Sequence, residues 1–354
     1  MWPPFALPNW GLRVALVEET HLSGVCLNWG YIPTKSLLRN AEVISLLGRG
    51  KEFGFSLEGF RADYGAAVDR SRKVSARLVK GVGALMRKNK VTVIEMLPRV
   101  LPLEDAEVGA VVERAFKRRR IKLLTAIRLE ALEMTDHGVQ VRIFGKKGEQ
   151  RVEAERVLIA VGVRPNSEGL EAVGVQTERE YVLVDEQMRT NIPGVYTIGD
   201  LTGKMALAHV ASAQGIVAVE SIAGRETARL DYAMMPRCTY CQPQVASFGL
   251  TEDQAVRHGQ EIRVGRFPFL ANGKALGLGE REGFVKIIAD AHSGEILGAH
   301  LVGPEVTELL PELILARSKG LAPNEIAHGV HAHPTVSEAL MEAVHDVFGQ
   351  ALHL

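Results

Sequence analysis

A histidine and a glutamate near the carboxyl end of the chain are spaced for proton transfer. His333 and Glu338 belong to the run HPTVSE at residues 333–338. Imidazole titrates near neutral pH, so a histidine that a carboxylate orients can serve as the base for a thiol. Thr335 and Glu338 also fit a helix capping box ahead of apolar residues. The residues alone leave both interpretations open, and His331 is a weaker candidate base.

A second group of candidate residues follows the run TNIPGVYTIGD, which ends at Asp200. A strand that ends in Gly-Asp places a carboxylate at the carboxyl edge of a sheet. The helix after it points its N–H groups toward whatever binds there. That helix is expected to begin among Ala206, Leu207, Ala208 and His209. On the Gly-Asp pair alone, Asp200 could equally be a turn or capping residue.

The chain contains three cysteines. Cys26 opens the run CLNWGYIPTK, which ends in Lys35, and taken alone Lys35 would be a solvated residue of a first helical turn. Cys238 and Cys241 resemble a redox or zinc motif. In an extended strand, however, residues at this spacing are about 10 Å apart, and a disulfide needs Cα atoms within roughly 7 Å. A zinc site would need two more ligands. We interpret this pair as packing thiols, although a dithiol of Cys26 with one of them stays open.

The composition is that of an ordinary soluble protein of two or three domains. The chain has 354 residues, of which 46% are hydrophobic, and its 42 Lys and Arg balance 42 Asp and Glu. A net charge of zero removes the usual electrostatic basis for binding nucleic acid or anionic lipid. The first residues lack the basic flank and apolar core of a signal peptide, so a reducing cytoplasm is the expected location. The expected partner is a small molecule or a protein.

The elements that must position these residues alternate between strands and helices. Short apolar, β-branched runs predict buried parallel strands at residues 13–18, 91–95, 156–161 and 194–198. Apolar spacing of three to four residues predicts helices at 107–119 and 206–223. From about residue 231 the pattern changes to alternating strands at 284–288 and 296–302, followed by helices. The sequence therefore predicts an α/β part followed by a separate α+β domain.

Taken together, these runs resemble the dihydrolipoyl dehydrogenase branch of the flavin disulfide reductases. The family pattern C-L-N-x-G-C-I-P-T-K matches residues 26–35, except that Tyr31 occupies the place of the second cysteine. In the family the two thiols form a disulfide beside the flavin, and both are needed, because one attacks the substrate disulfide and the other resolves the mixed disulfide. Cys26 matches the first thiol. A phenol at position 31 cannot form the bond.

The resemblance also implies roles for the other candidate residues. Lys35 would approach the flavin ring, Asp200 would accept a hydrogen bond from the flavin ribityl chain, and residues 206–209 would line the flavin. His333, oriented by Glu338, would be the base for the substrate thiol and would act from the partner subunit of a dimer. No residue is expected to bind a metal.

The nucleotide-binding parts of the family pattern are incomplete. Glu18 matches the carboxylate that binds the FAD ribose, Glu95 matches its NAD counterpart, and Gly162 lies in the turn near the bound nicotinamide nucleotide. A glycine-rich phosphate loop should precede each carboxylate, and neither is present. The resemblance therefore implies an N-terminal truncation and a large internal deletion. Loss of strands from two parallel sheets would leave unpaired edges and apolar faces.

We expect four segments: a partial FAD-binding domain at 1–90, a partial NAD-binding domain at 91–165, the rest of the FAD-binding domain at 166–230, and a dimerisation domain at 231–354. The fold class is α/β, with incomplete Rossmann-like domains before an α+β domain. The implied function is oxidation of dihydrolipoyl groups with FAD and NAD, impaired by Tyr31. The implied partners are a second copy of the chain and the lipoyl domains of a 2-oxo acid dehydrogenase complex, with no nucleic acid or membrane.

Two alternatives stay open. A catalytically dead homologue could act as a dimerisation partner or scaffold, because the segment from residue 231 onward is fully represented while the nucleotide domains are damaged. A flavin diaphorase that uses a single thiol would require flavin binding without the glycine fingerprint.

Overall fold

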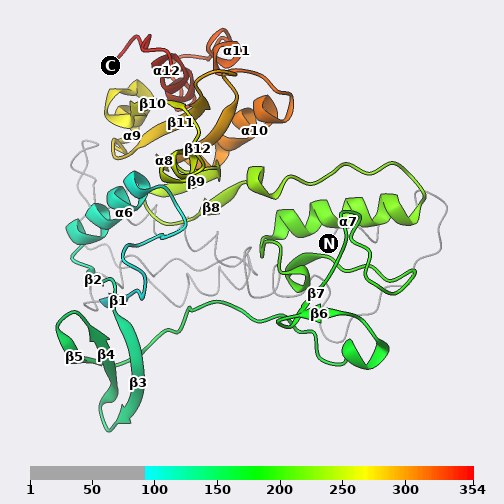
Figure 1. The fold of residues 1–354 in the computed structure, drawn as a ribbon. Coiled ribbons are helices and arrows are strands. Elements are labelled where there is room, and N and C mark those ends of the chain that lie inside the picture. Colours follow the sequence, from blue (N-terminus) through cyan, green and yellow to red (C-terminus); the bar gives the residue numbers. More distant parts are fainter. Residues whose placement is uncertain (1–91) are drawn as a thin grey trace, which may run out of the picture. The chain divides into compact units, whose positions relative to one another are not determined.

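The computed structural model describes residues 92–354, which divide into two compact units. One unit is Arg164–Arg229, and the other combines Thr92–Val163 with Leu230–Leu354. Figure 1 shows the path of the chain through each of them. The predicted strand at residues 13–18 lies outside the described residues. Within the described part of the chain, no helix is long and apolar enough to cross a membrane.

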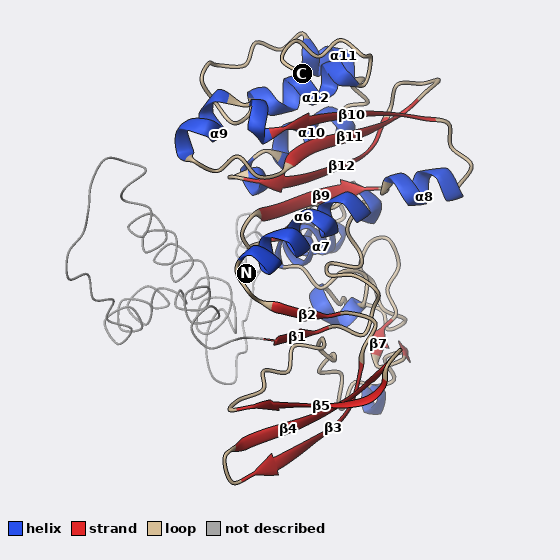
Figure 2. Cartoon of the chain, turned by 90° about the vertical axis from the view of Figure 1, so that its left-hand side faces the viewer, coloured by secondary structure: helices blue, strands red, loops and turns tan. Residues whose placement is uncertain are grey.

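A five-stranded antiparallel sheet forms the centre of the larger unit (Figure 2). Its strand order is β10-β11-β12-β9-β8. The bounds are β8 (Arg237–Thr239), β9 (Gln244–Gly249), β10 (Ile262–Pro268), β11 (Phe284–Asp290) and β12 (Ile296–Gly303). Every residue of β12 is buried, as expected of a central strand. The strands predicted at 284–288 and 296–302 are confirmed.

Helices cover this sheet and complete an α+β domain, as predicted. They are α8 (Glu252–Arg257), α9 (Gly273–Leu278), α10 (Leu310–Ser318), α11 (Pro323–Ala327) and α12 (Glu338–Asp346). Helix α12 packs on β10 and β11. Its buried residues Leu340 and Val344 join Phe248, Phe267 and Leu301 in one apolar core. The core therefore fixes the first turn of α12, which carries Glu338.

The first part of the larger unit contains a parallel pair of strands, β1 (Thr92–Ile94) and β2 (Lys122–Leu124), joined by helix α6 (Ala106–Arg118). This confirms the strand predicted at 91–95 and the helix predicted at 107–119. A three-stranded antiparallel meander follows, made of β3 (Arg128–Thr135), β4 (Gly138–Gly145) and β5 (Gly148–Ala154). The valines of α6 pack in one cluster with Val245 of β9 and Val302 of β12.

The strand predicted at residues 156–161 is wrong. This segment pairs with no strand among the described residues. Leu158 and Val161 are each 90% exposed. A buried parallel strand needs neighbours in its sheet, and within residues 92–354 the parallel pairing consists of β1 and β2 alone. The apolar run is present, but residues 92–354 supply no strand that pairs with it.

The smaller unit, Arg164–Arg229, contains a short hairpin of β6 (Thr177–Glu178) and β7 (Tyr181–Val182), and one long helix, α7 (Ala208–Ile222). Helix α7 confirms the helix predicted at 206–223. The strand predicted at 194–198 is wrong, because the chain turns back on itself there. The N–H of Thr190 donates to the carbonyl of Val195 at 2.9 Å, and the N–H of Thr197 donates to the carbonyl of Met188 at 3.1 Å.

Candidate functional site

The structure brings His333 and Glu338 together at the start of α12. Nδ1 of His333 lies 2.8 Å from Oε1 of Glu338. Because an ionised carboxylate only accepts hydrogen bonds, Nδ1 carries the proton and Nε2 has a free lone pair. The His333 side chain is 77% exposed, whereas that of Glu338 is 20% exposed. The pair therefore presents a basic nitrogen to solvent, backed by a partly buried carboxylate.

The same glutamate closes the turn that precedes α12. The N–H of Thr335 donates to Oε2 of Glu338 at 2.8 Å, and the Nδ2 group of Asn272 donates to the carbonyl of Thr335 at 3.0 Å. Partial burial raises the pKa of the Glu338 carboxyl, but the hydrogen bonds from Thr335 and His333 outweigh it and hold this pKa below its usual range. Only half of the predicted capping box forms, because Ser337 is the N-cap of α12 without a side-chain cap, and the Thr335 hydroxyl donates to the carbonyl of Ala332 at 2.7 Å. The contacts with His333 and Thr335 use different oxygens of Glu338, so both can form together.

His331, the weaker candidate, has no ring nitrogen available for a substrate. Its Nδ1 lies 3.1 Å from the carbonyl of Gly329, and its Nε2 lies 3.0 Å from Oε1 of Glu312. These contacts fix the imidazole in place. Of the two histidines, only His333 has the geometry of a base for an external thiol.

The carboxylate of Asp200 is accessible in the smaller unit. Asp200 lies in the 3-10 turn η3 (Gly199–Thr202), and its carboxylate is exposed and bonds to no residue within 92–354. Helix α7 begins at Ala208, so Ala206 and Leu207 precede the helix while Ala208 and His209 form its first turn. Apart from the half-buried Leu207, these residues are exposed. An exposed acceptor near a helix start fits a chain of hydroxyl groups, as in flavin.

Two residues predicted to bind a nicotinamide nucleotide, Glu95 and Gly162, lie among the described residues. Glu95 follows β1, but one oxygen of its carboxylate accepts the N–H of Leu97 at 2.8 Å and so closes a local turn. Gly162 has φ +115° and open space around its Cα. It lies in the segment that forms no strand. Their role in binding a nucleotide stays a prediction.

The two described cysteines have the character of packing thiols. Neither forms a disulfide within residues 92–354, and both are only partly accessible. Burial raises the pKa of the Cys241 thiol to about 11. Its sulfur donates to the carbonyl of Pro243 at 3.1 Å. No group of His, Cys, Asp and Glu within residues 92–354 could hold a metal ion. Cys26, Lys35 and Glu18 lie outside the described residues.

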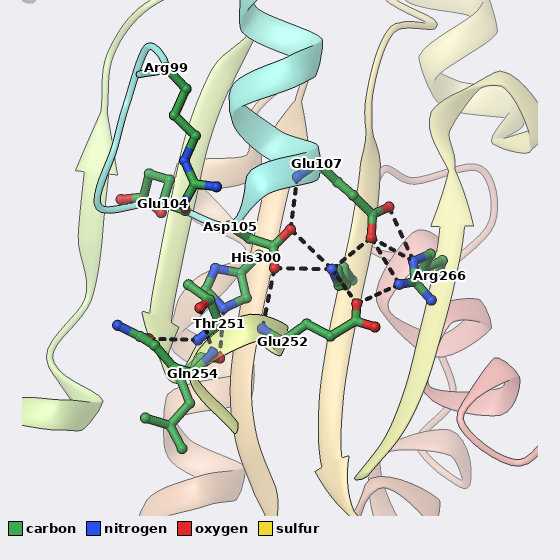
Figure 3. Close-up of polar contacts among 11 residues, drawn as sticks. Arg99, Glu104, Asp105, Glu107, Thr251, Glu252, Gln254, Arg266 and His300 are labelled. Atoms are coloured by element: carbon green, nitrogen blue, oxygen red, sulfur yellow. Dashed lines mark hydrogen bonds and ion pairs between the residues drawn. The ribbon is translucent and has the colours of Figure 1, made fainter. Parts of the chain in front are cut away.

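Sequence reasoning missed an ionic cluster in the larger unit, built around the buried side chains of Lys286 and Asp105 (Figure 3). Fully buried Lys286 donates to Asp105 at 3.0 Å and to Glu107 at 2.7 Å, and it pairs with Glu252 at 2.7 Å. Arg266 binds Glu107 at 2.8 Å and Glu252 at 2.6 Å. We call these five residues the Lys286 cluster. It joins the start of α6 to α8, β10 and β11.

Asp105 is the centre of the Lys286 cluster. Its carboxylate accepts the N–H of Glu107 at the start of α6, at 3.0 Å, and the N–H of Glu252 at the start of α8, at 3.3 Å. Burial raises the pKa of the Asp105 carboxyl, but the Lys286 ammonium more than offsets this and holds that pKa below its usual range. The cluster therefore has a structural role, which is to fasten the segment after β1 to the five-stranded sheet.

Comparison with known proteins supports the resemblance. Residues 76–215 match the pyridine nucleotide-disulphide oxidoreductase domain, and residues 235–344 match the dimerisation domain of the same proteins. The dihydrolipoyl dehydrogenase of Mycobacterium bovis is 41% identical over 441 residues, covering 97% of this chain and 94% of the relative. That of Rhizobium etli is 37% identical over 454 residues, with the same coverage of both chains.

Solved structures show the same fold. The flavoprotein disulfide reductase RclA from Escherichia coli superposes with a TM-score of 0.82 at 19% identity, covering 97% of this chain and 96% of the other. LpdA from Mycobacterium tuberculosis gives a TM-score of 0.79 at 21% identity, covering 91% and 90%.

The alignment with the Mycobacterium bovis relative spans 441 residues, whereas this chain has 354. The relative therefore carries internal residues that this chain lacks. This confirms the internal deletion inferred from the missing glycine loops. The dimerisation-domain match supports a homodimer. By sequence and by fold, the chain therefore belongs to the dihydrolipoyl dehydrogenase family of the pyridine nucleotide-disulfide oxidoreductases.

Proposed function

We propose that this chain is a disulfide oxidoreductase of the dihydrolipoyl dehydrogenase type, which uses FAD and NAD as its family does, with impaired turnover of dihydrolipoyl groups. The observation that supports it best is the His333–Glu338 pair, in which Nδ1 is held at 2.8 Å and Nε2 is left exposed. Such a pair takes the proton of a thiol at Nε2, and the Glu338 carboxylate stabilises the resulting imidazolium.

The impairment is proposed from chemistry at position 31. In a complete cycle, a substrate thiolate attacks a protein disulfide, one protein thiol leaves, and the second substrate thiolate displaces the mixed disulfide. The substrate loses two electrons, and the protein gains two thiols. Cys26 supplies one of these sulfurs, and Tyr31 supplies none. Bound FAD would supply a two-electron acceptor. Asp200, Ala206, Leu207, Ala208 and His209 would hold it, together with Lys35 and Glu18.

The domain division is part of the proposal. We assign residues 1–90 and 166–230 to a partial FAD-binding domain, 91–165 to a partial NAD-binding domain, and 231–354 to the dimerisation domain. Lipoyl domains of a 2-oxo acid dehydrogenase complex are proposed as partners, and the cytoplasm as the location, because the relatives are dihydrolipoyl dehydrogenases and the composition is that of a protein from a reducing compartment.

The test is a comparison of the natural chain with Tyr31→Cys, which restores the second thiol, and with Tyr31→Ser as the matched control. After desalting, the visible absorbance of each protein reports bound flavin, and NAD reduction by dihydrolipoamide reports turnover. We expect flavin in all three, near-background turnover in the natural chain and in Tyr31→Ser, and clearly higher turnover in Tyr31→Cys. Natural-chain turnover near that of the dihydrolipoyl dehydrogenase of Mycobacterium bovis would contradict the impairment.

A second function is favoured by the contrast within the larger unit. The five-stranded sheet is formed, whereas the segment at 156–161 pairs with no strand within residues 92–354. A chain that dimerises but does not turn over dihydrolipoyl substrates would act as a dimerisation partner or scaffold. A colourless protein that still co-purifies as a dimer would favour this function over the oxidoreductase. A coloured protein that passes electrons from NADH to an artificial acceptor dye would instead favour a single-thiol diaphorase.

A further inference from the structure

A buried glutamine lies behind the turn that carries Asp200. Gln214, on α7, is fully buried. Its Oε1 accepts the N–H of Gly199 at 2.6 Å, and its Nε2 donates to Oγ1 of Thr202 at 3.3 Å. The Thr202 hydroxyl in turn donates to the carbonyl of Gly199 at 2.8 Å. One side chain therefore binds both ends of the turn η3.

The backbone on each side of η3 needs such support. Gly199 has φ +77° and Gly203 has φ +63°, both in the left-handed region. At Gly203 a Cβ would lie 2.7 Å from the Tyr181 ring, so the chain passes close to β7 there. Because the Asp200 carboxylate bonds to no described residue, the backbone of the turn alone sets its position.

We infer that Gln214 is a positioning residue, which sets the Asp200 carboxylate to accept hydrogen bonds from the hydroxyl chain of a bound flavin. The inference rests on the proposed function. A primary amide suits the place because it offers one acceptor for the Gly199 N–H and one donor for the Thr202 hydroxyl. A buried group that loses its partner is costly, so removing the amide leaves the Gly199 N–H unsatisfied and loosens the turn.

The experiment uses the full chain with Gln214→Met, which keeps the length of the side chain and removes both polar atoms. The matched control is Ser221→Ala, because Ser221 on the same helix contacts Arg189 at 3.1 Å and is not part of the turn. We expect Gln214→Met to weaken flavin binding by about tenfold or more, as the loss of a buried hydrogen bond implies. The Gly199 amide should exchange its hydrogen faster, and the control should leave both unchanged.

Two more variants keep the inference testable if Gln214→Met does not fold. Thr202→Val removes only the hydroxyl and should weaken flavin binding in the same direction. Gln214→Glu keeps the acceptor for Gly199 but loses the donor to Thr202, so it should rescue part of the affinity that methionine loses. Rescue by the isosteric carboxylate would not follow from a purely packing role.

The outcomes separate this inference from the proposed function. Equal flavin affinity in the natural chain and Gln214→Met, with flavin bound, would overturn the inference and leave the oxidoreductase proposal intact. Unchanged hydrogen exchange at Gly199 in Gln214→Met would overturn it as well, whether or not flavin binds. A natural chain that binds no flavin would overturn the oxidoreductase proposal, and with it the role of Gln214 in flavin binding.

Discussion

Cys241 is expected to be a poor replacement for the thiol that the chain lacks at position 31. Burial raises its pKa to about 11, so at pH 8 only about one molecule in a thousand is the reactive thiolate. We expect iodoacetamide to label Cys241 far more slowly than free glutathione at pH 8. The labelling rate should rise up to about pH 11. Peptide mass spectrometry measures it directly, and rapid labelling at pH 8 would show that the thiol is activated.

His300 makes the larger unit sensitive to mild acid. This β12 residue is fully buried, its Nε2 lies 2.9 Å from the carbonyl of Leu250, and its Nδ1 has no described partner. Burial lowers the pKa of His300, although nearby Asp105 and Glu104 act to raise it and Arg237 to lower it. The folded state therefore holds a neutral ring, while the unfolded state binds a proton below about pH 6.5.

The free energy of unfolding should thus fall as the pH drops below about 6.5 toward the folded pKa of His300. In His300→Gln this part of the pH dependence should vanish, because an amide can still donate to Leu250 without titrating. Urea unfolding between pH 7.5 and 5 measures it. His292→Gln, at an exposed histidine, is the control and should keep the slope of the natural chain. Equal slopes in all three proteins would contradict the assignment.

At the scale of elements, the Lys286 cluster determines whether α6 stays on the sheet. Lys286→Met would leave the three carboxylates of the cluster with Arg266 as their one remaining cation within it. We expect a loss of about 3–5 kcal/mol in the free energy of unfolding, because one partner of a buried ion pair is removed. Lys117→Met is the matched control, since its pair with Glu113 is exposed and should be worth less than about 1 kcal/mol. Equal losses would contradict a structural role for the cluster.

The cluster also gives the sign of the response to stronger acid. Burial raises the pKa values of the Asp105 and Glu107 carboxyls. The contacts with Lys286 and Arg266 lower these pKa values by more than burial raises them, so both lie below their usual range. Their contribution is present above the unfolded pKa values, near 4, and is lost as the pH falls through the depressed folded values. The stability gap between the natural chain and Lys286→Met should therefore narrow below about pH 4.

The unpaired segment at residues 156–163 is a second element with a predictable behaviour. Leu158, Val161 and Val163 are 90%, 90% and 71% exposed. Exposed apolar, β-branched segments with no partner strand are prone to pair with other chains. We expect the chain to form assemblies larger than a dimer, and Val161→Lys with Val163→Lys to reduce them in light scattering. Val330→Lys, at an isolated exposed valine, should not. An unchanged scattering signal in the double variant would exclude this segment as the cause.

At the scale of the whole molecule, the sequence correctly predicted the elements whose own apolar pattern is sufficient to specify them. The strands β11 and β12 and the helices α6 and α7 carry their own apolar periodicity, so they formed as predicted. The runs at 156–161 and 194–198 have strand composition, but a parallel strand forms only when other segments flank it. The Lys286 cluster could not be predicted, because its residues lie as far apart as Asp105 and Lys286 and meet only in the folded unit.

The contact between His333 and Glu338 in the larger unit could be predicted from the sequence, whereas the role of Gln214 in the smaller unit could not. His333 and Glu338 are close in sequence and share one turn, so their contact followed from spacing. Gln214 was not singled out, because a glutamine on a helix carries no signal until the turn that it holds is known. Motifs therefore identified the groups that could do chemistry, and the structure identified what fixes them in place.

We expect the dimerisation domain to determine the oligomeric state, and not the partial FAD- and NAD-binding domains. The match to a dimerisation domain covers residues 235–344, and the sheet and helices of that region are all formed. We expect a homodimer of about twice 38.6 kDa in sedimentation velocity, with or without flavin. The Val161→Lys and Val163→Lys variant should remain that dimer while its larger assemblies disappear, because residues 161 and 163 lie outside the matched dimerisation domain. A monomer at micromolar concentration would show that the deletion has also disabled the domain that it left whole.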